Sequence, residues 1–296
     1  MKKQLTCLCC SLLLLSGCAG GHITAVKDGD TKVMTIGKNS YTKEELYNLL
    51  KKSVGSSTAI SELQKLIYDV EVPVTDEIRQ SAQEEMDTLA NETEDFDALL
   101  KENGYTRDTY LENVVIPNVQ SDKLMEKYYT DNKTAIKKEY KPSTAVILQC
   151  DDEKNAQKAL DALKNGTDQK EVFEQYQSEN ASFSDDDVLI TTQTLNIPTR
   201  MINTLYKQKE AGLVNEVFTS DTATAAYVAI LKDNNYDNLL PKLQESLSSN
   251  TDFATQCVQF YLKKHNFEIH DQDIFNDFKA NYRQFLVSNP ELMNEE

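Results

Sequence analysis

Few side chains in this chain could carry out acid–base, redox or metal chemistry. Of its six cysteines, four lie within the first 18 residues, and the others are Cys150 and Cys257. The histidines are His22, His265 and His270. A zinc site needs about four ligands close together, and the sequence holds no cluster of Cys and His. We therefore expect neither a metal site nor a cofactor.

The two later cysteines are expected to be buried free thiols. Cys150 ends an apolar run, and Cys257 lies in a helix-like pattern, which suits the cysteine side chain as a small apolar group. A disulfide between them is the alternative, because separation along the chain does not determine distance in space.

The residues before Cys18 form a pattern that indicates a chemistry other than metal binding or catalysis for this cysteine. Lys2 and Lys3 precede an apolar run that ends at Leu15, a pattern typical of a secretory signal. The run is far shorter than the roughly 20 residues of a membrane-spanning helix. Leu15-Ser16-Gly17-Cys18 resembles the bacterial lipobox. The resemblance implies cleavage before Cys18 and a diacylglyceryl group on its thiol; an ordinary signal peptide with an incidental cysteine is the alternative.

Charge and anchoring limit the partners. Two acyl chains hold a protein stably on a membrane, so the lipobox implies a lipid-anchored protein on the extracytoplasmic face of a Gram-positive-type cell membrane. The net charge of −17 becomes −19 once Lys2 and Lys3 leave with the signal. Such acidity argues against a nucleic-acid partner and is most simply explained by solubility. Alternatively, the acid keeps the protein off an anionic membrane and favours basic clients.

The elements that must position any site begin with a helical region. Residues 33–36 favour a strand, and Thr42 can cap a helix with Glu45 as its partner. A second helix is expected from about Ser57 and ends before Pro73. Apolar residues at helical spacing form the expected inward faces: Leu46, Leu49 and Leu50, then Ile60, Leu63, Leu66 and Ile67. Further helices are expected from Thr75, over 96–102 and 106–115, and from near Pro117.

The pattern changes at Lys141-Pro142 to a small α+β domain. Its expected elements are a strand at 144–150, helices at 152–164 and 169–177, a strand at 188–192, a helix at 198–207, and strands at 213–218 and 225–231. The order β-α-α-β-α-β-β within about 90 residues is typical of a small α+β fold. From Asn238 the helical pattern returns.

The predicted fold class is therefore α+β: a mostly helical lobe built from N- and C-terminal segments, with an inserted small α+β domain. The domains expected are a signal peptide at 1–17, a tether at 18–32, an N-terminal helical region at 33–140, the inserted domain at 141–234, and C-terminal helices at 235–288 that pack on the N-terminal region.

This layout resembles the parvulin-type foldase lipoproteins of Gram-positive bacteria, the PrsA family. The resemblance lies in Tyr41-Thr42-Lys43-Glu44-Glu45-Leu46, in residues 156–176 around the turn Lys164-Asn165-Gly166, in residues 211–218, and in residues 266–271. It implies a parvulin-like inserted domain and a chaperone or foldase that assists unfolded exported polypeptides. A homodimer is left open.

The active-site positions of that family depart from its pattern. The resemblance implies two facing histidines, and the matching residues here are Val146 and Val228. The acidic position matches Asp187, a weak catalytic candidate. The aromatic residue of the proline pocket is missing, with Met201 or Ile202 nearest. Since a catalyst of prolyl isomerisation must favour the twisted bond, the resemblance implies an inactive parvulin-like domain.

A binding function remains the leading hypothesis. A lipid-tethered protein at the export site would meet emerging chains at high effective concentration and could shield their apolar segments. An active peptidyl-prolyl isomerase with an atypical site is the second hypothesis, and a surface interaction lipoprotein is another. A solute-binding lipoprotein usually has two similar α/β lobes around its ligand, and no repeat of the small domain is present.

Overall fold

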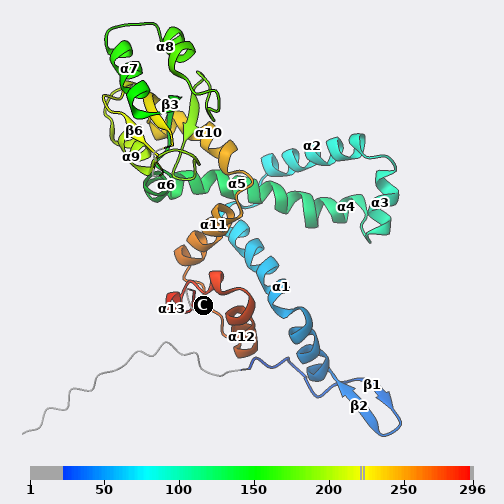
Figure 1. The fold of residues 1–296 in the computed structure, drawn as a ribbon. Helices are drawn as coiled ribbons and strands as arrows, with labels where there is room; N and C mark the ends of the chain where they lie inside the picture. Colours follow the sequence, from blue (N-terminus) through cyan, green and yellow to red (C-terminus); the bar gives the residue numbers. More distant parts are fainter. Residues whose placement is uncertain (1–22, 221, 223, 294–296) are drawn as a thin grey trace, which may run out of the picture. The chain divides into compact units, whose positions relative to one another are not determined.

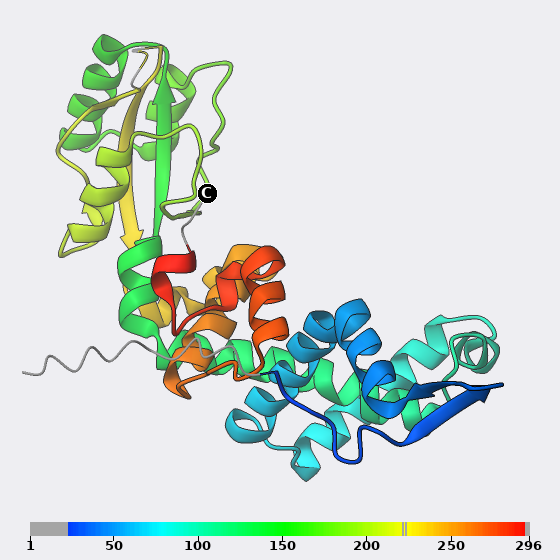
Figure 2. The same ribbon diagram turned by 90° about the horizontal axis from the view of Figure 1, so that it is seen from below.

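The computed structural model describes residues 23–220, 222 and 224–293, and it divides into two compact units (Figures 1 and 2). The terminal unit combines the residues up to Ile67 with those from Val258 onward. The central unit is continuous from Tyr68 to Cys257. The domain boundaries expected at 140/141 and 234/235 fall inside the central unit and stay predictions.

The terminal unit opens with a β-hairpin at the start of a long helix (Figure 1). Its elements are β1 (Lys32–Ile36), β2 (Asn39–Thr42), α1 (Lys43–Glu71) as far as Ile67, α11 (Thr251–Lys264) from Val258, α12 (Gln272–Asn281), the 3-10 turn η2 (Arg283–Phe285) and α13 (Pro290–Met293). Strands β1 and β2 are antiparallel, with Met34 opposite Tyr41 and Ile36 opposite Asn39. Gly37 adopts a φ of +59° in the turn, a conformation that glycine takes at little cost.

Helix α1 starts as predicted and continues further than predicted. The Thr42 N–H donates to the Glu45 carboxylate at 2.7 Å, and the Glu45 N–H donates to Thr42 Oγ1 at 3.3 Å, which confirms the capping pair. The expected break before Ser57 is wrong, because one helix runs through Gly55. A Cβ atom on Gly55 would lie 2.9 Å from Ile274 Cδ1, so the glycine permits close packing there.

The helical part of the central unit contains an aromatic cluster. Its elements are α2 (Asp76–Glu92), α3 (Phe96–Glu102), α4 (Arg107–Tyr110), the π-helical turn η1 (Leu111–Val115), α5 (Ile116–Asp131), α6 (Lys133–Tyr140), α10 (Tyr236–Leu247) and α11 as far as Cys257. The Phe253 ring lies 5.3, 4.8 and 5.6 Å from the rings of Tyr128, Tyr129 and Tyr140. Contacts at these distances add to the energy of apolar burial.

The turn η1 explains how the chain passes Pro117 without a break. The Ile116 N–H donates to the Leu111 carbonyl, five residues back. This wider turn absorbs the missing N–H of Pro117, so the two helices expected on either side of the proline form one continuous run. The predicted Thr75 cap is confirmed, with Ile78 N–H bonded to Thr75 Oγ1 at 3.3 Å.

The small domain is an antiparallel sheet with a helical layer on each face. Its strands are β3 (Ser143–Cys150), β4 (Val188–Ile190), β5 (Gly212–Leu213), β6 (Phe218–Thr219) and β7 (Ala226–Asp233), in the order β4-β3-β7-β5 with β6 also paired to β7. The long strands β3 and β7 lie side by side (Figure 2). The single strand expected at 213–218 is two short strands, β5 and β6.

Helices α7 (Glu153–Lys164), α8 (Gln169–Tyr176) and α9 (Thr199–Lys207) complete this domain. Residues of α7 and α8 pack on one face of the sheet, and residues of α9 pack on the other. The predicted fold class is confirmed: the chain is mostly helical, with a small α+β module between helical segments and with N- and C-terminal segments joined in one unit.

Candidate functional site

Val146 and Val228 lie together in an apolar layer of the small sheet. Val146 in β3 is opposite Ile230, and Val228 in β7 is opposite Leu148. Both valines are about 1% exposed and belong to the cluster covered by α7 and α8, which also holds Leu160, Phe173 and Cys150. The partly buried Tyr176 packs against this cluster. The two positions that the resemblance assigns to histidines are therefore sealed among apolar side chains.

The Cys150 thiol is the titratable group buried inside this cluster. Burial, together with the nearby carboxylates of Asp151 and Asp152, raises the pKa of Cys150 to about 12. Reactivity of a cysteine depends on its thiolate form, so Cys150 is an unreactive thiol at neutral pH. Cys150 and Cys257 are both free and buried, which confirms the prediction made for them.

The residues nearest to the missing proline-pocket aromatic lie on the opposite face of the sheet. Met201 and Ile202 of α9 pack with Ile147 and Tyr227 in the second cluster. The Tyr227 hydroxyl donates to the Asn196 carbonyl at 2.7 Å, and burial raises its pKa. Because successive residues of a strand face opposite sides, the structure does not bring Val146 and Val228 together with Met201 and Ile202 in one pocket.

Asp187 lies apart from both clusters, in an exposed turn before β4. Its side chain is 50% exposed, and its Oδ1 is 3.9 Å from Lys232 Nζ. Asp187 lines an open depression of about 590 Å³ that is also bordered by Leu189, Lys242 and Glu245. A single solvated carboxylate of this kind can accept hydrogen bonds or bind a cation weakly. Its assignment as a catalytic residue stays a prediction.

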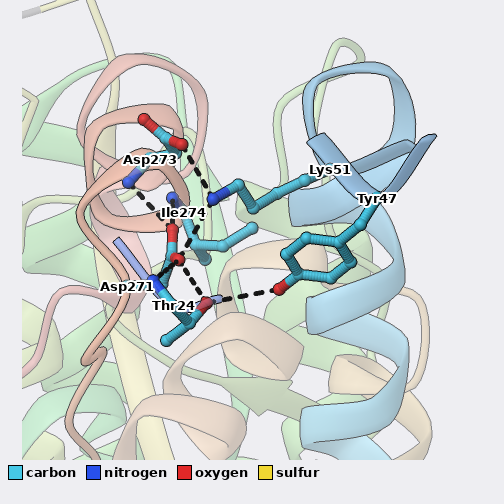
Figure 3. Close-up of polar contacts among 6 residues, drawn as sticks. All are labelled: Thr24, Tyr47, Lys51, Asp271, Asp273 and Ile274. Carbon is cyan, nitrogen blue, oxygen red and sulfur yellow. Dashed lines mark hydrogen bonds and ion pairs between the residues drawn. The ribbon is translucent and has the colours of Figure 1, made fainter. Parts of the chain in front are cut away.

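The terminal unit contains a buried polar cluster that the sequence analysis did not identify (Figure 3). The Lys51 ammonium on α1 lies 3.1 Å from Asp271 Oδ2 and 2.8 Å from Asp273 Oδ2. Asp271 Oδ2 also accepts from the Thr24 N–H at 2.9 Å and the Thr24 hydroxyl at 2.5 Å. Thr24 Oγ1 in turn lies 3.3 Å from the Tyr47 hydroxyl. We call this set the clasp.

The clasp also starts helix α12. Asp271 Oδ1 accepts from the N–H groups of Asp273 and Ile274 at 2.9 and 3.0 Å, an N-cap that places negative charge at the positive helix end. Burial would raise the pKa of Asp271, but the bonds from Thr24, from the Ile274 N–H and from Lys51 outweigh it and hold that pKa well below its ordinary value. Burial likewise opposes charge on Lys51, yet both carboxylates raise its pKa.

Sequence reasoning could have found only part of the clasp. An Asp before a helical pattern is a helix-start signal, which marks Asp271. Nothing local marks Lys51, whose main partner is 220 residues away. The clasp ties chain segments together, and its buried ammonium is neutralised by two carboxylates, so we interpret it as structural.

Two leucines of the expected inward stripe of α1 are exposed, whereas the third, Leu46, is half-buried. Leu49 and Leu50 are 53% and 52% exposed, and Val54 is 49% exposed. Lys51 and Gly55 lie on the side of the helix that meets Asp271 and Ile274. The polar and small residues, not Leu49 and Leu50, therefore face the rest of the terminal unit.

Several expectations concern residues or features beyond these sites. Cys18 and the signal at 1–17 lie outside the described residues. Among the described residues, no helix is both long and apolar enough to cross a membrane. Within the same part of the chain, no group of three or more His, Cys, Asp or Glu side chains is arranged to hold a metal ion.

Comparison with known proteins gives similarity in structure alone. No protein-family model matches the chain, and no curated protein matches it. The crystal structure of the peptidylprolyl isomerase PrsA from Bacillus cereus is similar, with 20% identity, a TM-score of 0.50, and coverage of 85% of this chain and 98% of that chain.

Two further crystal structures match less closely. The foldase protein PrsA from Streptococcus pneumoniae has 16% identity, a TM-score of 0.38, and coverage of 84% of this chain and 98% of that chain. PrsA from Bacillus subtilis has 18% identity, a TM-score of 0.36, and coverage of 84% and 99%. The Bacillus cereus structure is the basis for our statement that this chain has a PrsA-like fold.

Proposed function

We propose that this protein is a membrane-anchored extracytoplasmic chaperone of the PrsA type, which holds unfolded exported polypeptides, and that its parvulin-like domain is not an isomerase. The single observation that carries the chaperone proposal is the exposed apolar face of α1, with Leu49, Leu50 and Val54 on the surface. Neighbouring apolar side chains left on the surface of a folded protein provide a place where an apolar segment of another chain can bind.

The PrsA-like fold supports a protein of the PrsA type, and the similar Bacillus cereus protein is named a peptidylprolyl isomerase, so isomerase activity is tested separately below. An unfolded client exposes apolar segments, and burying them releases about 25 cal/mol per Å². A face of two leucines and a valine provides modest affinity, which suits transient holding. Such holding would limit aggregation while clients fold.

The exposed apolar side chains of α1 can be tested by measuring how well the protein suppresses aggregation of an unfolded client. The double variant Leu49→Ser/Leu50→Ser should lower the suppression of aggregation of a reduced, unfolded client several-fold. The matched control is Leu195→Ser, which removes a leucine that is 78% exposed in the central unit. All three side chains are exposed, so stability should change by no more than about 0.5 kcal/mol. Equal loss in both variants, or in neither, would contradict the assignment of this face.

The absence of isomerase activity is a separate part of the proposal. Val146 and Val228 are sealed in an apolar layer, and neither side chain can donate a hydrogen bond that favours the twisted prolyl bond. We expect no acceleration of cis–trans exchange in a prolyl peptide above the uncatalysed rate, which takes tens to hundreds of seconds. Clear catalysis would favour the active isomerase instead, and loss of that catalysis in Asp187→Asn would then assign it to the depression that Asp187 lines.

The lipid anchor on Cys18 is the third part of the proposal. It rests on the lipobox resemblance of Leu15-Ser16-Gly17-Cys18. Anchoring would keep the chaperone where exported chains emerge, and the effective concentration of a tethered partner reaches roughly the millimolar range with a short linker. Even a low-affinity apolar face would then be occupied by clients.

A further inference from the structure

The β1–β2 hairpin presents apolar side chains to solvent. Every residue from Thr31 to Ser40 is exposed, including Met34 at 61% and Ile36 at 80%. Met34 and Ile36 are two residues apart in β1, so they lie on the same face of the hairpin. A two-stranded hairpin is at best marginally stable in water, and apolar residues on its open face indicate a surface on which it rests.

The charge of the hairpin identifies the kind of surface. Residues 31–43 contain Lys32, Lys38 and Lys43 and no acidic residue, in a chain whose net charge is −17. Asp28, Asp30 and Glu44 flank only its base. Basic and apolar side chains together favour the interface of an anionic bilayer. The same charge disfavours pairing with the hairpin of a second copy, since like charges repel.

The attachment of the N-terminal segment places the hairpin near the anchor. Thr24 is fixed by Asp271 and lies 3.3 Å from the Tyr47 hydroxyl. Tyr47 is only four residues beyond Lys43, or about 6 Å along the helix axis. Cys18 precedes Thr24 by six residues, which span at most about 20 Å. Thr24 and the hairpin thus both lie near the start of α1.

We propose that the hairpin rests on the anionic headgroup layer of the membrane that holds Cys18, with Met34 and Ile36 at the interface and Lys32 and Lys38 against phosphates. This inference rests on the proposed lipid anchor. It also divides the roles of charge: the acidic remainder of the chain is repelled by the bilayer, while one basic hairpin is attracted. The start of α1 would then be held toward the membrane.

The experiment uses a tryptophan as its reporter, because the natural chain has none. The variant Ile36→Trp is made in the mature chain, and Cys18 is coupled to a maleimide lipid in vesicles of phosphatidylglycerol and phosphatidylcholine. Cys150 and Cys257 are buried, so the coupling is directed to Cys18. We expect emission at shorter wavelength than in the vesicle-free protein, and quenching by brominated acyl chains. The control Leu195→Trp should show neither change.

Lys32 and Lys38 allow a second test, which measures how strongly the hairpin contacts the membrane. Each basic residue near an anionic surface strengthens contact about fivefold, so Lys32→Gln/Lys38→Gln in the Ile36→Trp chain should lower the contact equilibrium about 25-fold. Vesicles of phosphatidylcholine alone should have a similar effect.

Three outcomes would overturn the proposal. The first is unchanged tryptophan emission of Ile36→Trp on anionic vesicles. The second is a shift in emission wavelength without vesicles that grows with protein concentration, which would indicate binding to a second copy. The third is a shift that appears only when an unfolded client is added. Since the lipid is attached chemically, these outcomes do not depend on natural lipidation of Cys18, which membrane fractionation of cells tests separately.

Discussion

Removing Asp271 should open the terminal unit more than any other single change in the clasp. Asp271→Ala removes the cap of α12, worth about 1 kcal/mol, and leaves the buried Lys51 ammonium with only the partly exposed Asp273 carboxylate. Loss of a hydrogen bond to a charged group adds about 1.5–3 kcal/mol. The expected total of about 3 kcal/mol agrees with values for breaking one side of a buried ion pair.

The opposite change should cost less. Lys51→Met leaves Asp271 with four other donors, namely the N–H and hydroxyl of Thr24 and the N–H groups of Asp273 and Ile274. We expect about 1.5–2 kcal/mol for this variant. The double variant should cost less than the sum of the two, because no buried charge is then left without its partner.

Native-state hydrogen exchange is the suitable assay, because a chain of two units has no single unfolding free energy. The Phe275 amide donates to the main-chain carbonyl of residue 271 at 2.9 Å, an acceptor that every variant keeps, so it reports the opening of α12. About 3 kcal/mol corresponds to an increase in its exchange rate of about 150-fold. An increase below about threefold for Asp271→Ala, or a larger effect for Lys51→Met, would refute the burial and bonding described here.

Three further predictions follow from the same unit and from the anchor. The folded-state pKa of Asp271 lies below its ordinary value. Its contribution to stability is therefore complete above about pH 4 and is lost as pH falls through the folded-state pKa. The melting temperature of the terminal unit should decrease toward pH 2, and it should decrease less steeply for Asp271→Asn. Gly55→Val should destabilise by about 1–3 kcal/mol through crowding against Ile274, whereas Gly55→Ala should be nearly neutral in melts, because helix propensity offsets a contact that the Ile274 methyl can relieve. Cys18→Ala should move the protein from the membrane to the medium in cell fractionation, and continued membrane association would argue against the lipid anchor.

Local signals in the sequence predicted the elements of the small domain and several helix starts. The Thr42–Glu45 pair and the Thr75 cap depend only on residues within one turn, and β3 is a continuous apolar run buried on both faces. Such features can be predicted because the groups that make the bond are also neighbours in the sequence.

The predictions that were wrong concern residues whose environment depends on packing against distant parts of the chain. A second helix was expected from about Ser57, but the first helix continues through Gly55, against which Ile274 packs. Leu49 and Leu50 were expected to face inward, and they are exposed because Lys51 on the other side of α1 is held by Asp271. Helical periodicity identifies an apolar stripe but does not show which face a partner segment from the far end of the chain will cover.

For the candidate site, the positions to inspect could be predicted, but their arrangement in space could not. The resemblance to the PrsA family identified Val146, Val228 and Asp187 as the positions to inspect, and the pattern of strands placed the valines in a core. Their separation from Met201 and Ile202 depends on which face of the sheet each helix covers. That choice is made by the packing of α7, α8 and α9 and has no local signature.

The clasp has a consequence for the order in which the parts of this protein fold. Tyr68–Cys257 is continuous and can fold before the C-terminal segment is available, but Lys51 must wait for Asp271, 220 residues later. Until the segment that holds Asp271 and Ile274 is available, α1 lacks the carboxylate partners of Lys51 and the side chain that packs against Gly55. If the protein is the chaperone proposed above, a chain that stops before that point would itself be an incompletely folded client for complete copies.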